Sequence, residues 1–279
     1  MGIFHKLPPL PKKSVSRDQV RRAIEERFDI PSDFHFYLAI ESIIHIHPDF
    51  DAAVARIFKA DKKAHVFLLS TSNRKVWRNQ LQERMESASV DPARLHFLTD
   101  VDQKQETMLM RAADAVVASL HMTRPRASLQ AFAAGVPVVT FPSELWASRI
   151  TYGFYQQMGI NDLVASSLDE YVELAIKLAT DTTFHKKMEQ LIKRNRSKLS
   201  EDVQAVKEWE KFFDFAGQQI FPSGEQYSGS DWGWGQSNGL EGLDDWGRVE
   251  GVGDVVEWAS IENADGTLEW IPVEKVEKE

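Results

Sequence analysis

The sequence predicts an α/β protein built on a single Rossmann-like, doubly wound parallel sheet, followed by C-terminal helices and an acidic tail. Five short apolar runs typical of buried strands lie between amphipathic stretches, at residues 34–40, 65–70, 95–98, 115–120 and 136–141. Strands that alternate with helices usually pair in parallel, with helices on both faces of the sheet. Between residues 168 and 215 only helical patterns occur, so we expect the parallel sheet to end before that point.

Helical spacing fills the intervals between these strands. The predicted helices cover residues 16–28, 48–58, 75–88, 103–113 and 127–134, a helix that ends at residue 158, and longer helical stretches at 168–180 and 184–215. In the first helix Val20, Ile24 and Phe28 recur every fourth residue and mark its buried face. Pro48 begins the second helix, because proline is favoured in the first helical turn.

Residues 130–140 carry the clearest local signal. Residues 130–134 predict the end of an Ala-rich helix, and Gly135 follows where a helix C-cap needs a positive φ. The valines that follow suit a strand covered on both faces. Pro137 can begin that strand without removing a ladder hydrogen bond.

The flanking residues extend this pattern into a family resemblance. Residues 141–150 read FPSELWASRI, residues 171–181 form a helix ending in Thr-Asp, and residues 47–51 read HPDFD. With the unit at 130–140, this order resembles the C-terminal, donor-binding lobe of the O-GlcNAc transferase and Spindly family, over about residues 25–215.

The resemblance implies one half of a two-lobe (GT-B) glycosyltransferase that binds a nucleotide-diphosphate sugar and transfers the sugar to a protein hydroxyl. UDP-GlcNAc is the favoured donor and a GDP-sugar such as GDP-fucose is the other family option. No cofactor is expected beyond the donor. We find no counterpart of the family's N-terminal lobe or of its tetratricopeptide repeats in the sequence.

A basic loop leads into the helix that ends at Gly135. A helix N-terminus offers free N–H groups and a partial positive charge, which suit a diphosphate. Arg124 and Arg126 add cations with bidentate donors, and Ser128 adds a hydroxyl. The alternative interpretation is two solvated arginines and a capping serine.

Other nucleotide-sugar-binding residues come from the resemblance alone. Gln130 takes the place of an acidic residue that holds the ribose, and His45 takes the place of a lysine that meets the diphosphate. The base-recognition stretch falls on residues 100–104, where backbone atoms near Val101 would serve and Lys104 would approach a phosphate.

The sequence also departs from the family at this site. The family's His-Thr-Thr run falls on Pro125, Arg126 and Ala127, and a pocket histidine falls near Glu106. Together with Gln130, these changes leave no catalytic residue to assign. They motivate an alternative function, a non-catalytic lobe that acts as a binding or scaffold module, and a fragment of a larger transferase is a further reading.

The pair His45 and His47 raises the question of a metal site, since residues i and i+2 of a strand share a face. Local spacing fixes no third ligand, and the family resemblance implies no metal in this lobe. We therefore expect no metal.

Charge and composition limit the remaining function classes. The segment after residue 221 carries fourteen acidic and three basic residues, a net charge of −11, so the preceding residues carry +2 of the chain's −9. This nearly neutral body argues against nucleic-acid binding. The sequence has no cysteine, no apolar run of membrane-spanning length and no signal-peptide core, so we expect an intracellular protein of the cytoplasm or nucleus with no membrane association.

Three segments are expected along the chain: a flexible basic N-terminus with the start of a helix at 1–24, the lobe at 25–218 and the tail at 222–279. Glycine and acidic residues without a dense apolar pattern predict that the tail is mostly disordered. Apolar runs at 255–261 and 267–273 flank an Asp-Gly turn and predict a hairpin. Five tryptophans in this tail predict a protein partner, and the alternative is a solubilising tail without one.

Overall fold

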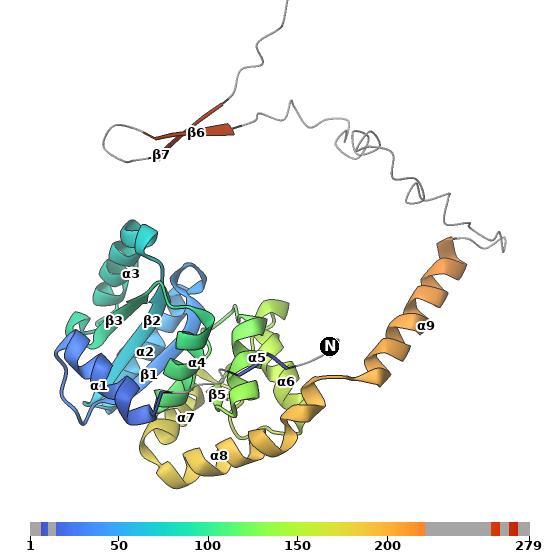
Figure 1. Ribbon diagram of the computed structural model, residues 1–279, viewed down its shortest axis with the longest axis horizontal. Coiled ribbons are helices and arrows are strands. Elements are labelled where there is room, and N and C mark those ends of the chain that lie inside the picture. Colours follow the sequence, from blue (N-terminus) through green and yellow to red (C-terminus); the bar gives the residue numbers. More distant parts are fainter. Residues whose placement is uncertain (1–6, 11–14, 221–257, 263–267, 273–279) are drawn as a thin grey trace, which may run out of the picture. The chain divides into compact units, whose positions relative to one another are not determined.

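The computed structural model describes residues 7–10, 15–220, 258–262 and 268–272. The chain forms two compact units, Met1–Phe212 and Phe213–Glu279, and the division lies within the helix at residues 203–220. The first unit contains a five-stranded, all-parallel sheet with the strand order β3-β2-β1-β4-β5 (Figure 1). The predicted single doubly wound sheet is confirmed.

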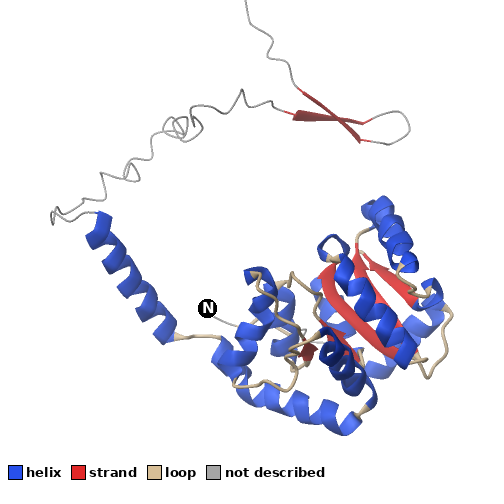
Figure 2. Cartoon of the chain, turned by 180° about the vertical axis from the view of Figure 1, so that it is seen from behind, coloured by secondary structure: helices blue, strands red, loops and turns tan. Residues whose placement is uncertain are grey.

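The strands of this sheet are β1 (His35–Ser42), β2 (Ala64–Ser70), β3 (Leu95–Thr99), β4 (Ala115–Val117) and β5 (Val138–Val139). The α-helices in the described ranges are α1 (Arg17–Phe28), α2 (Pro48–Ala60), α3 (Lys75–Ser87), α4 (Gln103–Ala112), α5 (Pro125–Ala134), α6 (Ile150–Met158), α7 (Leu168–Thr180), α8 (Thr182–Asn195) and α9 (Val203–Ile220). Helices α1, α4 and α5 pack along one face of the sheet, and α2, α3 and α7 along the other (Figure 2).

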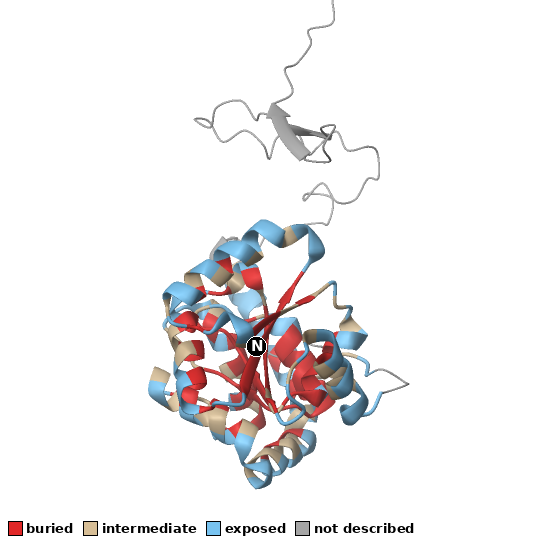
Figure 3. Ribbon diagram, turned by 90° about the vertical axis from the view of Figure 1, so that its left-hand side faces the viewer, coloured by how far each residue is buried: buried red, intermediate tan, exposed pale blue. Residues whose placement is uncertain are grey.

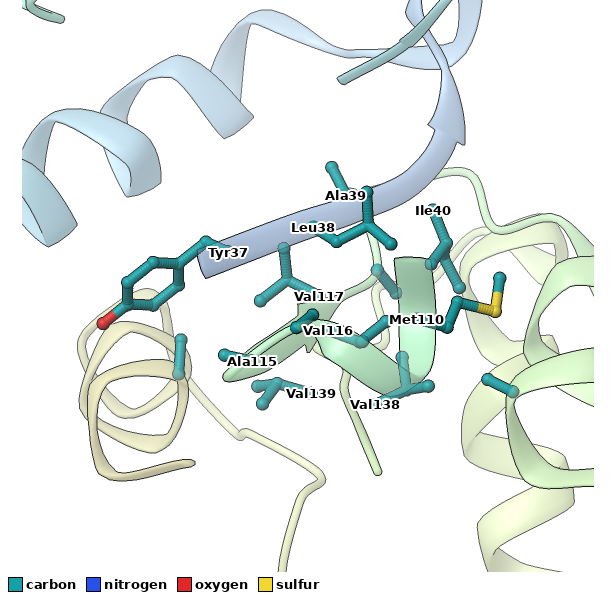
Figure 4. Packing of buried hydrophobic residues seen from close by; sticks show 14 of the residues in the cluster. Tyr37, Leu38, Ala39, Ile40, Met110, Ala115, Val116, Val117, Val138 and Val139 are labelled. Carbon is teal, nitrogen blue, oxygen red and sulfur yellow. The ribbon is translucent and has the colours of Figure 1, made fainter. Parts of the chain in front are cut away.

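The core lies on both faces of β1, the central strand. Residues 36–41 of this strand are all fully buried, as expected of a parallel strand that helices cover on both sides. Figure 3 shows the buried residues gathered on the strands and on the inner faces of the helices. Figure 4 shows residues of β1, β4 and β5 packing together with Met110 of α4.

The predicted order of helix, glycine cap and strand within residues 130–140 is confirmed. Helix α5 ends at Ala134, and Gly135 adopts the left-handed conformation with φ 77°. Its N–H donates to the carbonyl of Phe132, and the N–H of Val136 donates to the carbonyl of Ala131. Glycine is favoured at this position because a side chain would strain the backbone.

The helical stretch predicted at 184–215 is interrupted, and the structure corrects this expectation. Helix α8 ends at Asn195, and a short 3-10 turn buries Leu199. Glu201 then takes a positive φ of 56°, which stops helical continuation. Asp202 accepts hydrogen bonds from the N–H groups of Gln204 and Ala205 and so starts α9 as a new helix.

The edge strand β5 is shorter than predicted, and a tyrosine of α6 forms hydrogen bonds with the backbone groups on its outer side. The hydroxyl of Tyr155 donates to the carbonyl of Val138 at 2.7 Å and accepts from the N–H of Val138 at 2.9 Å. Tyr155 is fully buried, and it also packs edge-on against Phe132 of α5. At Val138 the outer edge of β5 is therefore covered by this side chain instead of being left open.

We expect Tyr155→Phe to lower the free energy of unfolding by about 2 kcal/mol, because it leaves a buried N–H and a buried carbonyl without partners. Chemical denaturation monitored by circular dichroism measures this change. Tyr152→Phe, on the half-buried side of the same helix, is the control and is expected to change stability little. Equal effects of the two variants would show that the Tyr155 hydroxyl does not stabilise β5.

In the second unit, the two predicted strands of the tail form an antiparallel pair, β6 (Trp258–Glu262) and β7 (Leu268–Pro272). The turn predicted between them and most of the tail, including the segment predicted to be disordered, lie outside the described residues. None of the helices in the described ranges combines the length and the apolar character that a membrane span requires.

Candidate functional site

The strand order changes direction between β1 and β4, which marks the place where wound sheets bind ligands. In such sheets the crevice lies outside the carboxyl ends of the strands on either side of the switch. Here β1 continues into residues 43–47, and β4 continues into residues 118–124, which lead to the start of α5. These two loops and the beginnings of α4 and α5 form the candidate site.

The N-terminus of α5 is held against the end of β1 by Arg124. This residue is the N-cap, and no side chain caps the first N–H groups of the helix. Its Nη1 donates to the carbonyl of Ile40 at 2.8 Å and to Glu106 Oε1 at 3.2 Å. Because Glu106 pairs with it, much of the positive charge of Arg124 is balanced within the protein.

Arg126 is exposed in the first turn of α5, and its Nη2 donates to the neutral amide oxygen of Gln103 at 2.8 Å. Among the described residues no carboxylate forms an ion pair with it. The charge of Arg126 is therefore less neutralised than that of Arg124.

Gln130 lies between α4 and α5 rather than facing the solvent. Its Nε2 donates to the carbonyl of Gln103 at 2.8 Å and to Thr107 Oγ1 at 2.7 Å, and the residue is buried. Both amide protons are therefore used within the protein. The ribose-binding role suggested for Gln130 stays a prediction, and it would require these two hydrogen bonds to be exchanged.

Ser128 is fully buried, and its hydroxyl shares a hydrogen bond of 2.7 Å with Thr151 Oγ1 on α6. This geometry directs the hydroxyl into the packing between α5 and α6. Ser128 does not cap α5, because no side chain caps this helix. Its role in nucleotide-sugar binding stays a prediction, and it would require the hydrogen bond to Thr151 to be exchanged.

The stretch predicted for base recognition lies next to α5. Lys104 is exposed in the first turn of α4, and its N–H donates to the capping Asp102. Val101 precedes the cap and packs in part against the core. Since Gln103 contacts both Arg126 and Gln130, the structure brings residues 101–104 and the start of α5 together.

His45 lies near Arg124 and Arg74, and its surroundings disfavour the charged form of its ring. Burial lowers its pKa from the ordinary 6.5, and the positive charges of Arg124 and Arg74 lower it further. The role of His45 in meeting the diphosphate stays a prediction. His45 also lies in a 3-10 turn, Ile43–His45, and His47 caps α2, so the assumption that the two histidines share a strand is wrong.

Glu41 is a component of the site that the sequence analysis missed. It is fully buried near the carboxyl end of β1, and its Oε2 accepts from the N–H of Ser119 at 2.7 Å. Its Oε1 has no hydrogen-bond partner among the described residues. Burial raises the pKa of Glu41 to about 7, although Ser119 and Arg124 act in the opposite direction.

The sequence of this chain matches a known protein family. A sequence model of glycosyl transferase family 41 matches residues 13–209, which is more than two thirds of the chain. This chain belongs to glycosyl transferase family 41. The family 41 lobe is similar to the UDP-N-acetylglucosamine–peptide N-acetylglucosaminyltransferase of Caenorhabditis elegans, with 28% identity over 92 residues. The enzyme of that name from Giardia intestinalis is 34% identical over 107 residues.

These matches cover 33% and 38% of this chain but only 8% and 7% of the two relatives. Among solved structures, a Thermobaculum terrenum O-GlcNAc transferase variant has a TM-score of 0.61 at 22% identity, over 75% of this chain and 38% of that one. The Anabaena protein HepE in complex with UDP and glucose has a TM-score of 0.50 at 13% identity, over 72% of this chain and 53% of that one. At such identities the structures show the fold of the family 41 lobe, a Rossmann-like sheet similar to that of GT-B glycosyltransferases.

Proposed function

We propose that this family 41 lobe binds a nucleotide-diphosphate sugar and serves a transferase that passes the sugar to a protein hydroxyl. UDP-GlcNAc is the favoured donor and a GDP-sugar is the alternative, with no further cofactor. The observation that carries the proposal is an uncapped α5 N-terminus at the topological switch point, with Arg126 beside it. The names of the two similar peptide N-acetylglucosaminyltransferases support the choice of donor and acceptor.

The charges at this edge suggest how a diphosphate would be held. The first N–H groups of α5 and the guanidinium of Arg126 are complementary to a diphosphate. Arg124 would mainly position the helix, because its Nη1 already donates to the Ile40 carbonyl and to Glu106. In a transfer reaction these cations would stabilise the departing diphosphate.

Isothermal titration calorimetry of the full chain with UDP, GDP, UDP-GlcNAc and GDP-fucose tests this proposal. Binding of UDP and UDP-GlcNAc in preference to the guanine nucleotides would support the favoured donor. A preference for GDP and GDP-fucose would assign the alternative donor. No heat of binding with any of the four ligands at millimolar concentration would contradict nucleotide-sugar binding by this chain.

We expect Arg126→Ala to weaken UDP binding by roughly 10- to 100-fold, because a hydrogen bond to a charged group contributes about 1.5–3 kcal/mol. The matched control is Arg111→Ala, which removes an exposed arginine from the last turn of α4 and so from the opposite edge of the sheet. UDP affinity that falls equally in both variants would indicate a general charge effect instead of a site at α5.

A second candidate function is a non-catalytic binding or scaffold module, with a protein partner that binds the tryptophan-containing tail. The observation that favours it is the internal use of two predicted ligand-binding side chains, the Gln130 amide and the Ser128 hydroxyl. It predicts no sugar transfer when UDP-GlcNAc and acceptor peptides are supplied. Transfer that is detected by mass spectrometry and disappears in Arg126→Ala would refute it. The location in the cytoplasm or nucleus stays a prediction from the sequence.

A further inference from the structure

Two histidines and an aspartate converge at the carboxyl edge of the sheet, on the loops that follow β1 and β4. His121 Nε2 lies 2.7 Å from Asp49 Oδ2, and His47 Nδ1 lies 3.6 Å from the same oxygen. The imidazole rings of His47 and His121 are 4.5 Å apart in an edge-to-face arrangement. One ligand atom from each of the three residues lies within 4.8 Å of the others.

Local structure holds each of these side chains in place. His47 is the N-cap of α2, and its Nδ1 lone pair accepts the N–H of Asp49 at 3.2 Å, so a metal bound at Nδ1 would replace this hydrogen bond. His121 has a positive φ of 69°, an uncommon conformation for a residue with a side chain. The loop around it is fixed because Ser119 Oγ donates to the carbonyl of Met122 at 2.7 Å, and the N–H of Thr123 donates to the carbonyl of Ala147 at 3.0 Å.

We infer that His47, Asp49 and His121 form a binding site for one divalent transition-metal ion, with zinc as the best-fitting candidate. Two imidazole nitrogens and a carboxylate oxygen are ligands that Zn²⁺ accepts, and three protein ligands leave a fourth position for water. His121 would move its ring proton from Nε2 to Nδ1, so that the Nε2 lone pair becomes available to the metal. Small side-chain movements would then bring the three atoms within bonding distance of a common ion.

The cluster is accessible to an ion from solution. The side chains of His47, Asp49 and His121 are 50%, 57% and 29% exposed. His47 and His121 lie on the two loops that border the candidate site, but none of the three residues is among those predicted to bind the nucleotide sugar. Metal binding therefore needs neither the proposed nucleotide nor a transfer reaction. Its test therefore succeeds or fails independently of the proposed function.

The experiment titrates the full chain, without an affinity tag, with zinc chloride by calorimetry and with cobalt(II) chloride by visible absorption. We expect one zinc ion per chain and the d–d absorption bands of low-coordinate cobalt. Two variants remove the ligands with little disturbance of the fold. His47→Asn keeps a good helix N-cap, and His121→Asn keeps a residue that tolerates positive φ.

Each single variant is expected to weaken zinc binding by at least ~10-fold, and the double variant is expected to lose the cobalt bands. The control is His35→Asn, which removes a histidine of similar exposure that also contacts an aspartate, Asp61, at 2.7 Å. Zinc affinity as in the unaltered chain is expected for this control. Zinc or cobalt binding that is undiminished in His47→Asn and His121→Asn, or no one-to-one binding to the unaltered chain, would overturn the inference.

Discussion

A Glu41→Gln variant is expected to be more stable than the unaltered protein at pH 8 and to have similar stability at pH 4. Burial raises the pKa of Glu41 from 4.5 to about 7, so the folded protein holds this proton more tightly than the unfolded chain does. At about 1.4 kcal/mol for each pKa unit, ionisation of Glu41 costs the folded state about 3 kcal/mol above pH 7.

The sign of this effect fixes the pH window. Below pH 4.5 the Glu41 carboxyl is protonated in both the folded and the unfolded state, and it has no net effect on stability. As the pH rises from 4.5 to about 7, the unfolded chain releases the proton first, so the stability of the unaltered protein falls. Glutamine can still accept the N–H of Ser119 but carries no charge, so the variant loses this contribution to the pH dependence.

Urea denaturation at several pH values between 4 and 8 measures the difference between the two proteins. Glu173→Gln, an exposed position on α7, is the control and is expected to follow the unaltered protein. A Glu41→Gln variant that is less stable than the unaltered protein at pH 8 would show that the ionised carboxylate is stabilising in the fold.

Arg84→Ala is expected to lower the free energy of unfolding by about 3 kcal/mol, because it leaves the buried carboxylate of Asp51 without its cation. Arg84 binds Asp51 through two hydrogen bonds, Nε to Oδ2 at 2.7 Å and Nη2 to Oδ1 at 2.9 Å. The Asp51 side chain is only 3% exposed. Arg84 Nη2 also donates to the carbonyl of Ile46, so this residue ties α3 to α2 and to the loop that carries His45 and His47.

Two comparisons separate the ion pair from other effects of the Arg84 substitution. Arg78→Ala removes an exposed arginine of the same helix that binds only carbonyl groups among the described residues, and a much smaller change is expected. The double variant Asp51→Ala and Arg84→Ala should cost less than the sum of the two single variants. Additive costs in calorimetric unfolding would contradict a strong coupling between the two side chains.

The sheet could be predicted from the sequence because the apolar pattern of each strand reflects how that strand is buried. The apolar runs at β1 and β2 are continuous, as burial on both faces requires, and Gly135 marks the end of α5 through backbone conformation alone. The break between α8 and α9 was not predicted, because the capping Asp202 lies in a stretch whose composition is otherwise typical of a helix.

The candidate site was less predictable because its contacts join distant parts of the chain. The side-chain amide of Gln130 on α5 donates hydrogen bonds to Gln103 and Thr107 on α4. The residues next to Gln130 in the sequence do not indicate these partners. His121 reaches Asp49 over 72 residues, so spacing along the chain could not show the cluster. A polar residue inside an apolar strand, as at Glu41, is the one signal that would have shown a component of the site in advance.

The most direct test of a nucleotide site at α5 is a titration of isotope-labelled protein with UDP, followed by backbone amide NMR. Nucleotide binding at the uncapped end of α5 predicts saturable shifts for the amides of residues 126–128 and 101–104, with little change at residues 110–112, at the other end of α4. An absence of shifts at millimolar UDP, or shifts confined to residues away from the carboxyl edge of the sheet, would contradict it.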